Sequence, residues 1–166
     1  MANRPTQIIV HHTAASSPVP QFAAINDWHR ARAFPQSRSG HFVGYHYVIE
    51  RDGTVKQARQ DDEVGAHTVG ANLSSIGVAL VGNFNHEPPT EEQTEALARL
   101  LSTLVHRHGI LPSRIFPHRK FKQTDCYGQS LDDEWALRVY LHYEIDRLTH
   151  FIAELEALRD RRPDAS

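Results

Sequence analysis

Two histidines and one cysteine, far apart along the chain, have side chains that can bind a metal ion. His118 and Cys126 lie eight residues apart in a polar loop that follows a short predicted strand at 114–116, and His11 lies at the end of the predicted N-terminal strand. Imidazole and thiolate are ligands that zinc prefers, and three protein ligands plus water are typical of a catalytic zinc site. A water molecule bound there loses a proton near pH 7 and becomes a nucleophile.

Each of these residues also has a plainer interpretation. A lone cysteine is usually a small buried hydrophobic residue, and the pair His11-His12 at the end of a strand can simply lie on the surface. The chain has twelve histidines, so the residue type alone identifies no ligand. The prediction of a metal site therefore depends on the combination of the three residues.

The elements that must position these residues alternate between strands and helices. Strands are predicted at 7–10, 44–49, 54–58, 76–81 and 114–116, with an Asp52-Gly53 hairpin turn between the second and the third. Helices are predicted after Pro20, from Thr90 to Gly109 and over 131–162. This order predicts an α/β fold, with a mixed central β-sheet flanked by helices on both faces and an extra C-terminal helical tail.

The helix boundaries have sequence signals of their own. Thr90 and Gln93 form a capping box, Gly109 suits the C-terminal cap, and Ser130 can cap the last helical region, which is one bent helix or two. We expect a catalytic domain at 1–142 and a helical extension at 143–166 that packs on or beside it. The extension has one apolar stripe, made of Ile145, Leu148, Ile152, Leu155 and Leu158.

Composition narrows the classes of partner. The formal net charge is −2 with no long basic run, which argues against a nucleic-acid partner. No apolar segment approaches the ~20 residues of a membrane span, so we expect no stable membrane insertion. The first seven residues have no apolar run, so we expect no signal peptide, and a single cysteine allows no internal disulfide.

Four segments in register carry a resemblance to a known family. They are IIVHHTA at 8–14, GYHYVIERDGTV at 44–55, GAHTVGANLSSIGVALVGNF at 65–84 and HRKFKQTDC at 118–126. The chain resembles the zinc-dependent N-acetylmuramoyl-L-alanine amidases of the type 2 amidase family, which includes phage T7 lysozyme and the catalytic peptidoglycan recognition proteins. The resemblance covers roughly residues 7–135.

The resemblance implies roles for individual residues. The family's zinc ligands fall on His11, His118 and Cys126, which would hold one Zn²⁺. Family members that only recognise peptidoglycan generally lack the cysteine, so its presence favours catalysis. The catalytic tyrosine falls on Tyr45, and Thr124 stands where phage T7 lysozyme has a lysine that assists catalysis. A threonine hydroxyl can donate a hydrogen bond to the oxyanion but brings no positive charge.

Other positions that match the family predict substrate contacts. His46, His67 and Asn83 would line the groove, with loop hydrogen bonding as their structural alternative. Tyr127 replaces the proline that usually follows the cysteine in the family, and we expect it to offer a stacking surface to the substrate. His12 should point to the opposite sheet face from His11, and Trp28-His29 is typical of a helix packing pair.

The resemblance implies hydrolysis of the bond between N-acetylmuramic acid and the L-alanine of the stem peptide, with bacterial peptidoglycan as the partner. We expect a phage-type endolysin that accumulates in the host cytoplasm and acts on the wall after release. The alternatives are a bacterial or prophage recycling amidase, a binding module without activity, and a structural or regulatory protein whose histidines and cysteine are incidental. We expect a monomer, with dimerisation through the C-terminal helix as the alternative.

Overall fold

The computed structural model describes residues 2–15 and 19–161. In this part of the chain, five strands form one sheet in the order β3-β2-β4-β1-β5. The strands are β1 (Gln7–His12), β2 (Tyr47–Ile49), β3 (Val55–Gln57), β4 (Ser75–Leu80) and β5 (Ile115–Pro117). Neighbouring strands are parallel except β2 and β3, which the predicted hairpin joins in an antiparallel pair. The expected mixed sheet is confirmed.

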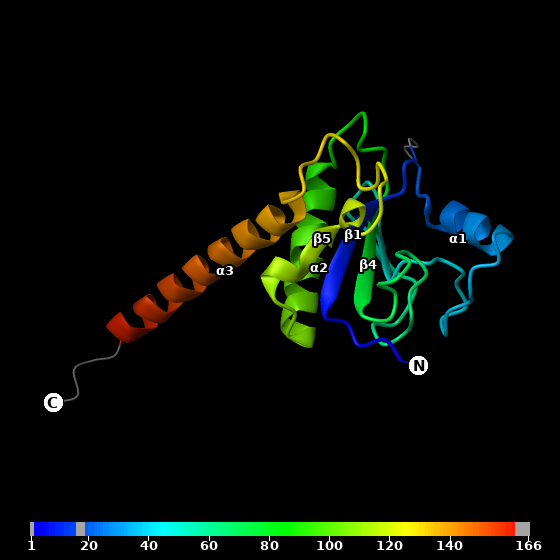
Figure 1. The fold of residues 1–166 in the computed structure, drawn as a ribbon. Helices are drawn as coiled ribbons and strands as arrows, with labels where there is room; N and C mark the ends of the chain where they lie inside the picture. Colours follow the sequence, from blue (N-terminus) through cyan, green and yellow to red (C-terminus); the bar gives the residue numbers. More distant parts are fainter. Residues whose placement is uncertain (1, 16–18, 162–166) are drawn as a thin grey trace.

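Helices cover both faces of the sheet, as predicted (Figure 1). The helices are α1 (Phe22–Ala31), α2 (Glu91–His108) and α3 (Trp135–Asp160), with short 3-10 turns η1 (Pro112–Arg114) and η2 (His118–Lys120). The larger core joins Ile8 and Val10 of β1 to α2 and to the start of α3. A smaller cluster on the other face brings Phe22 and Ile25 of α1 to Val48 of β2.

The predicted ends of α2 are confirmed. The Thr90 hydroxyl accepts a hydrogen bond from the Gln93 backbone N–H at 3.1 Å, and the Gln93 side chain accepts one from the Thr90 backbone at 3.2 Å. Such caps contribute about 1 kcal/mol. Gly109 ends the helix with φ +62°, the left-handed conformation that favours glycine. The Gln93 amide also donates to the carbonyl oxygen of Val81, just after β4, at 2.8 Å, which ties the start of α2 to the sheet.

The last helix differs from the prediction in two ways. Ser130 does not cap it, because the Ser130 hydroxyl donates to the Phe84 carbonyl instead and the helix begins at Trp135. α3 is a single helix that leaves the domain (Figure 1), and every residue from 145 to 160 is exposed. The expectation that the apolar stripe packs on its own domain is therefore wrong for the described residues. Residues 162–166 of the predicted extension lie outside them.

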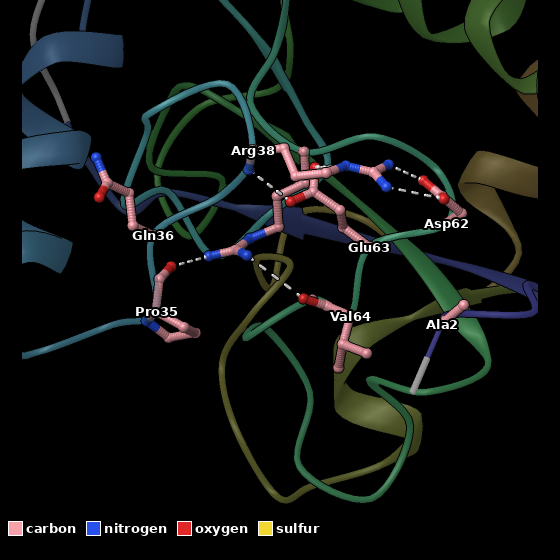
Figure 2. A pocket seen from close by; sticks show the side chains of 9 residues that line it. Ala2, Pro35, Gln36, Arg38, Asp62, Glu63 and Val64 are labelled. Atoms are coloured by element: carbon pink, nitrogen blue, oxygen red, sulfur yellow. Dashed lines mark hydrogen bonds and ion pairs between the residues drawn. The ribbon is translucent and has the colours of Figure 1, made fainter.

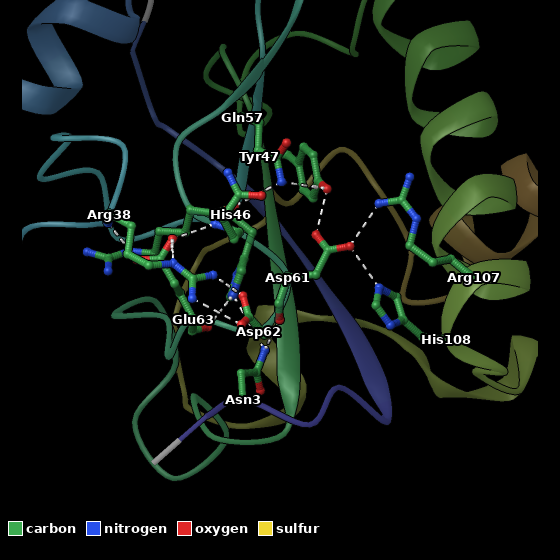
Figure 3. A network of polar contacts seen from close by, with 12 residues as sticks. Asn3, Arg38, His46, Tyr47, Gln57, Asp61, Asp62, Glu63, Arg107 and His108 are labelled. Atoms are coloured by element: carbon green, nitrogen blue, oxygen red, sulfur yellow. Dashed lines mark hydrogen bonds and ion pairs between the residues drawn. The ribbon is translucent and has the colours of Figure 1, made fainter.

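A half-buried carboxylate ties the loop after β3 to the rest of the fold (Figure 3). Asp61 accepts hydrogen bonds from the Tyr47 hydroxyl at 2.6 Å, His108 Nε2 at 2.8 Å and Arg107 at 2.9 Å. Burial alone would raise the pKa of Asp61, but these three donors outweigh it and lower the pKa. The network joins β2 to the end of α2 and so holds the loop that leads to His67.

No helix in residues 2–15 and 19–161 combines the length and the apolar character that crossing a membrane requires.

Candidate metal centre

His11 lies on the sheet face that α1 partly covers. Side chains alternate along β1, so Ile8 and Val10 enter the core beneath α2 while His11 points the other way. His12 points into the α2 side, as predicted: its Nδ1 accepts a hydrogen bond from the Phe84 backbone N–H at 3.0 Å. A buried central strand thus supplies one histidine to the candidate site and uses the next to hold the loop after β4.

The structure brings His11, His118 and Cys126 together. His118 begins η2 directly after β5, the strand beside β1, and Cys126 follows in the next loop. Their ligand atoms all lie within 4.8 Å of one another. His11 Nδ1 is 3.6 Å from Cys126 Sγ, and the two imidazole centroids are 4.4 Å apart. Tetrahedral ligands at zinc bond lengths have a nitrogen–sulfur separation of about 3.5 Å, so the spacing fits one ion.

His118 gives independent support for a metal site. Its Nδ1 is buried and has no hydrogen-bond partner among the described residues. Leaving a buried polar atom unpaired costs roughly 1–3 kcal/mol. An ion held between His118 and the other two residues would satisfy this nitrogen, so the residues present fit a metal.

Burial sets the protonation of the three residues. Burial, with His67 and His118 nearby, lowers the pKa of His11 well below its ordinary value. Burial and the nearby Lys122 also lower the pKa of His118, so both rings are neutral and can ligate. Burial raises the pKa of the Cys126 thiol to about 11. A cation at this position reverses that preference, because it favours the thiolate.

A chain of hydrogen bonds fixes which nitrogen of His11 faces the site. The Ser75 hydroxyl donates to the Ala71 carbonyl at 2.7 Å, so its oxygen accepts from His67 Nε2–H at 3.4 Å. His67 Nδ1 is then an acceptor, and His11 Nε2–H donates to it at 3.1 Å. This order leaves the lone pair of His11 Nδ1 directed toward Cys126, as a metal ligand requires.

The His67 ring sits in a tight cradle. A Cβ atom at Gly77 would lie 2.6 Å from the ring, and one at Gly65 would lie 2.5 Å from it. His46 supports the same region: it accepts from the Gly77 backbone N–H at 3.0 Å and donates to the Glu63 carbonyl at 2.9 Å. The His46 side chain is fully buried, which favours the hydrogen-bonding alternative over the predicted groove contact.

Tyr45 lies beside the three residues, with its ring centroid 5.0 Å from that of His11. Burial and the neighbouring Cys126 raise its pKa, so the phenol keeps its proton at neutral pH. Tyr45 also lines a cavity of about 360 Å³ against α1. The other lining residues are Thr13, Ala15, Gln21, Ala24, Ile25, Trp28 and His29.

Trp28 is a residue that the sequence analysis missed. We predicted a helix packing pair, but the Trp28 indole is 55% exposed and lines the cavity beside Tyr45, whereas His29 is buried. The Arg32 guanidinium lies 3.5 Å over the indole ring and holds it in place. Phe22, Ile25 and Trp28 recur at helical spacing, which is typical of packing, so the sequence has no signal that separates Trp28 from a core residue.

The remaining predicted residues lie in different surroundings. Thr124 accepts a hydrogen bond from the Cys126 backbone N–H at 3.3 Å, and Asn83 accepts one from the Asn85 backbone at 3.3 Å. Tyr127 is only 1% exposed, and its hydroxyl donates to the Asp132 carbonyl at 2.8 Å. The expectation that Tyr127 stacks on the substrate is therefore wrong, because its ring belongs to the core.

A second cavity, of about 450 Å³, has none of the three candidate metal ligands in its lining. Figure 2 shows the side chains that line it. Its buried cation, Arg59, donates to the Val43 carbonyl at 2.8 Å and to the carbonyls of Pro35 and Val64. Arg38 at the rim pairs with Asp62. Since these charges already have partners in the protein, the cavity holds loops together and does not resemble a ligand site.

The protein is an α/β protein in which a mixed sheet brings two histidines and a cysteine together as a possible metal site. Residues 1–129 match the N-acetylmuramoyl-L-alanine amidase family, and the chain belongs to it. The resemblance seen in the sequence is thereby confirmed.

Individual relatives agree with this assignment. The chain is 33% identical over 141 residues to the human N-acetylmuramoyl-L-alanine amidase, covering 82% of this chain but only 24% of that enzyme. It is 34% identical over 110 residues to the endolysin of Escherichia phage T7, covering 62% of this chain and 69% of the endolysin. Among solved structures, the amidase LysC from Clostridium intestinale superposes with a TM-score of 0.67 at 32% identity, covering 78% and 80% of the two chains.

Proposed function

We propose that this protein is a zinc-dependent N-acetylmuramoyl-L-alanine amidase that acts on bacterial peptidoglycan. The observation that carries the proposal is the convergence of His11, His118 and Cys126, with an unpaired His118 Nδ1, inside a family of amidases. The amide between the lactyl group of N-acetylmuramic acid and L-alanine breaks. Water supplies the new carboxyl oxygen, and the amine of L-alanine leaves with a proton.

Each residue at the centre has a separate task. One Zn²⁺ ion, when bound by the three residues, activates water and polarises the scissile carbonyl. Tyr45 keeps its proton and donates a hydrogen bond to the carbonyl oxygen as that oxygen gains negative charge. Thr124 accepts from the Cys126 backbone, which leaves its own hydroxyl proton for the substrate. The cavity beside Tyr45, with Trp28 on its wall, would hold the group next to the scissile bond.

In this proposal His67 positions the ring of His11. This role replaces the direct contact with the substrate that we predicted for His67. Its Nδ1 accepts the proton of His11 Nε2 and so fixes the tautomer and orientation of a ligand ring. A substrate contact of Asn83 remains a prediction that these hydrogen bonds do not address.

The biological setting that we propose is a phage-type endolysin. The similarity to the T7 endolysin and the presence of Cys126 support an enzyme that accumulates in the host cytoplasm and then reaches the wall. The similarity to Peptidoglycan-recognition protein SC2 of Drosophila melanogaster, 32% identical over 136 residues, keeps a binding module as the second candidate.

The test is product analysis on purified peptidoglycan with the wild type and Cys126→Ser. An amidase releases stem peptides that begin with free L-alanine, which mass spectrometry identifies directly. Zinc content is measured in parallel, and we expect about one ion per wild-type chain and strongly reduced zinc in the variant. Binding to the wall without new amino termini would establish the binding module, and full activity of the variant would refute the metal mechanism.

A further inference from the structure

The outer half of α3 is a helix without a partner. Within the described residues, α3 buries Ala136, Tyr140 and Glu144 against the domain, and no side chain after Glu144 is buried. The exposed part, 145–160, extends about 24 Å at 1.5 Å per residue. This part continues from the packed start of α3 but has no packing of its own, and in proteins most helical stability comes from packing of an apolar face.

From Leu141 onward, α3 exposes a continuous apolar surface, which we call the α3 stripe. Its members are between 39% and 60% exposed, and they are Leu141, Ile145, Leu148, Phe151, Ile152, Leu155 and Leu158. Together they present roughly 700 Å² of side-chain surface, more than soluble monomers usually expose as one patch. Two copies of the stripe would bury roughly 1,400 Å², which falls within the range of stable protein interfaces.

The stripe continues the face by which α3 packs on its own domain. Glu144, Phe151 and Leu158 are spaced seven residues apart and lie on one side of the helix, and Glu144 is buried against α2 through Ser102. If a second copy of the chain packed its α3 on this face in the parallel direction, the domain of the second copy would overlap the domain of the first. An antiparallel helix places the two domains at opposite ends.

We propose that the α3 stripe is a dimer interface in which two copies of this chain pair their outer helices antiparallel. A twofold axis near Phe151 and Ile152 places Ile145 opposite the partner's Leu158. The same register places Leu148 opposite the partner's Leu155, so apolar side chains meet along the whole contact.

Charges beside the stripe fit this register. Arg147 pairs with Glu144 of its own chain at 2.8 Å. In an antiparallel pair, each flank of one helix faces the same flank of its partner, so this register also brings the partner's Glu154 to the same flank as Arg147, offset by two residues or about 3 Å along the axis, twice in each dimer. In a parallel pair Phe151 would face the partner's acidic Glu156. Electrostatic complementarity therefore favours the antiparallel arrangement.

The charged residues of the exposed helix also argue against a lipid surface as the partner that covers the α3 stripe. Residues 145–160 contain four acidic side chains and two basic ones, Arg147 and Arg159. Helices that lie on anionic membranes are rich in Lys and Arg along their polar face. A net negative helix would be repelled by such a surface, whereas it pairs with a copy of itself through the Arg147–Glu154 contacts.

The first test is sedimentation equilibrium of the full chain with Leu148→Glu and the matched control Ala157→Glu. Both variants add one carboxylate to the outer helix, but Ala157 lies on the face opposite the stripe. We expect the wild type and Ala157→Glu to dimerise at micromolar concentration and Leu148→Glu to bind itself at least ~100-fold more weakly. Circular dichroism confirms that helix content is retained. A wild type that stays monomeric at ~500 μM overturns the proposal.

The second test addresses orientation through charge reversal. Glu154→Arg places like charges together at both Arg147 contacts, and we expect several-fold weaker dimerisation at low salt. Adding Arg147→Glu to that variant should restore the dimer. Failure of the double variant to recover overturns the antiparallel register. Cosedimentation of the wild type with phosphatidylglycerol vesicles, together with a monomeric state in solution, would instead identify a lipid surface and refute the dimer.

Discussion

Replacing Tyr45 with phenylalanine removes one hydroxyl group from the centre of the proposed mechanism. The ring stays, so its packing 5.0 Å from the His11 ring and 5.7 Å from the His29 ring is preserved. No ligand of the candidate metal centre changes. We therefore expect metal content and melting temperature to match the wild type, while the hydrogen bond to the developing oxyanion is lost.

The magnitude follows from what a buried oxyanion donor contributes. Tyr45 is partly buried, and its raised pKa keeps it a neutral donor throughout the working pH range. Loss of one such donor costs about 2.7–4 kcal/mol in the transition state, or roughly 10²–10³ in kcat. KM should change less than about threefold, because the interaction strengthens only as charge develops.

Tyr47→Phe is the matched control, two residues further along the chain. The Tyr47 hydroxyl donates to Asp61 at 2.6 Å, away from the metal centre, and Asp61 keeps its bonds from Arg107 and His108. We expect a loss of about 1–2 kcal/mol in unfolding free energy with kcat unchanged. The assay is release of L-alanine-terminated peptide from a soluble muropeptide, with zinc quantified in each preparation. If Tyr45→Phe binds as much zinc as the wild type and its kcat is within threefold of the wild-type value, the role assigned to Tyr45 is refuted.

Two further predictions concern histidines. His67→Phe removes the acceptor for His11 Nε2–H, so we expect zinc affinity to fall about 10–100-fold in chelator competition, and an unchanged affinity would contradict the positioning role. Burial lowers the pKa of His29 to about 4 from 6.5, so the unfolded chain binds more protons between these values and stability falls as pH drops through that window. His29→Gln should reduce this loss by about 1–2 kcal/mol between pH 7 and 4, measured by denaturant unfolding. An equally steep decline in the variant would exclude His29 as the cause.

The sequence carried most of the information about the metal centre. His11 and His118 follow or end strands that are neighbours in a parallel sheet, and parallel strands present their carboxyl ends at one edge. Strand periodicity also placed His12 on the face opposite His11, as observed. Side-chain direction in a regular strand is fixed by its period of two, so sequence reasoning succeeds there.

Residues in irregular segments were harder to place. His46 and Tyr127 were expected at the substrate, yet one is fully buried and the other nearly so. Neither lies within a regular element, so no periodicity gives the direction of its side chain. Their position depends on long-range partners such as the carbonyls of Glu63 and Asp132, which no local pattern identifies.

The C-terminal helix shows a different limit. Apolar spacing predicted five of the seven residues of the α3 stripe and missed Leu141 and Phe151. Spacing reports only that a face needs a contact and not what provides it. Tyr140 and Phe151 lie on the same helix, and the first meets the domain while the second meets solvent. The difference arises because α2 and β5 pack against the first part of α3, and the last residue of α3 that they bury is Glu144. An amphipathic pattern that outlasts its own domain is therefore evidence for a second surface, and here charge and area select another copy of the chain.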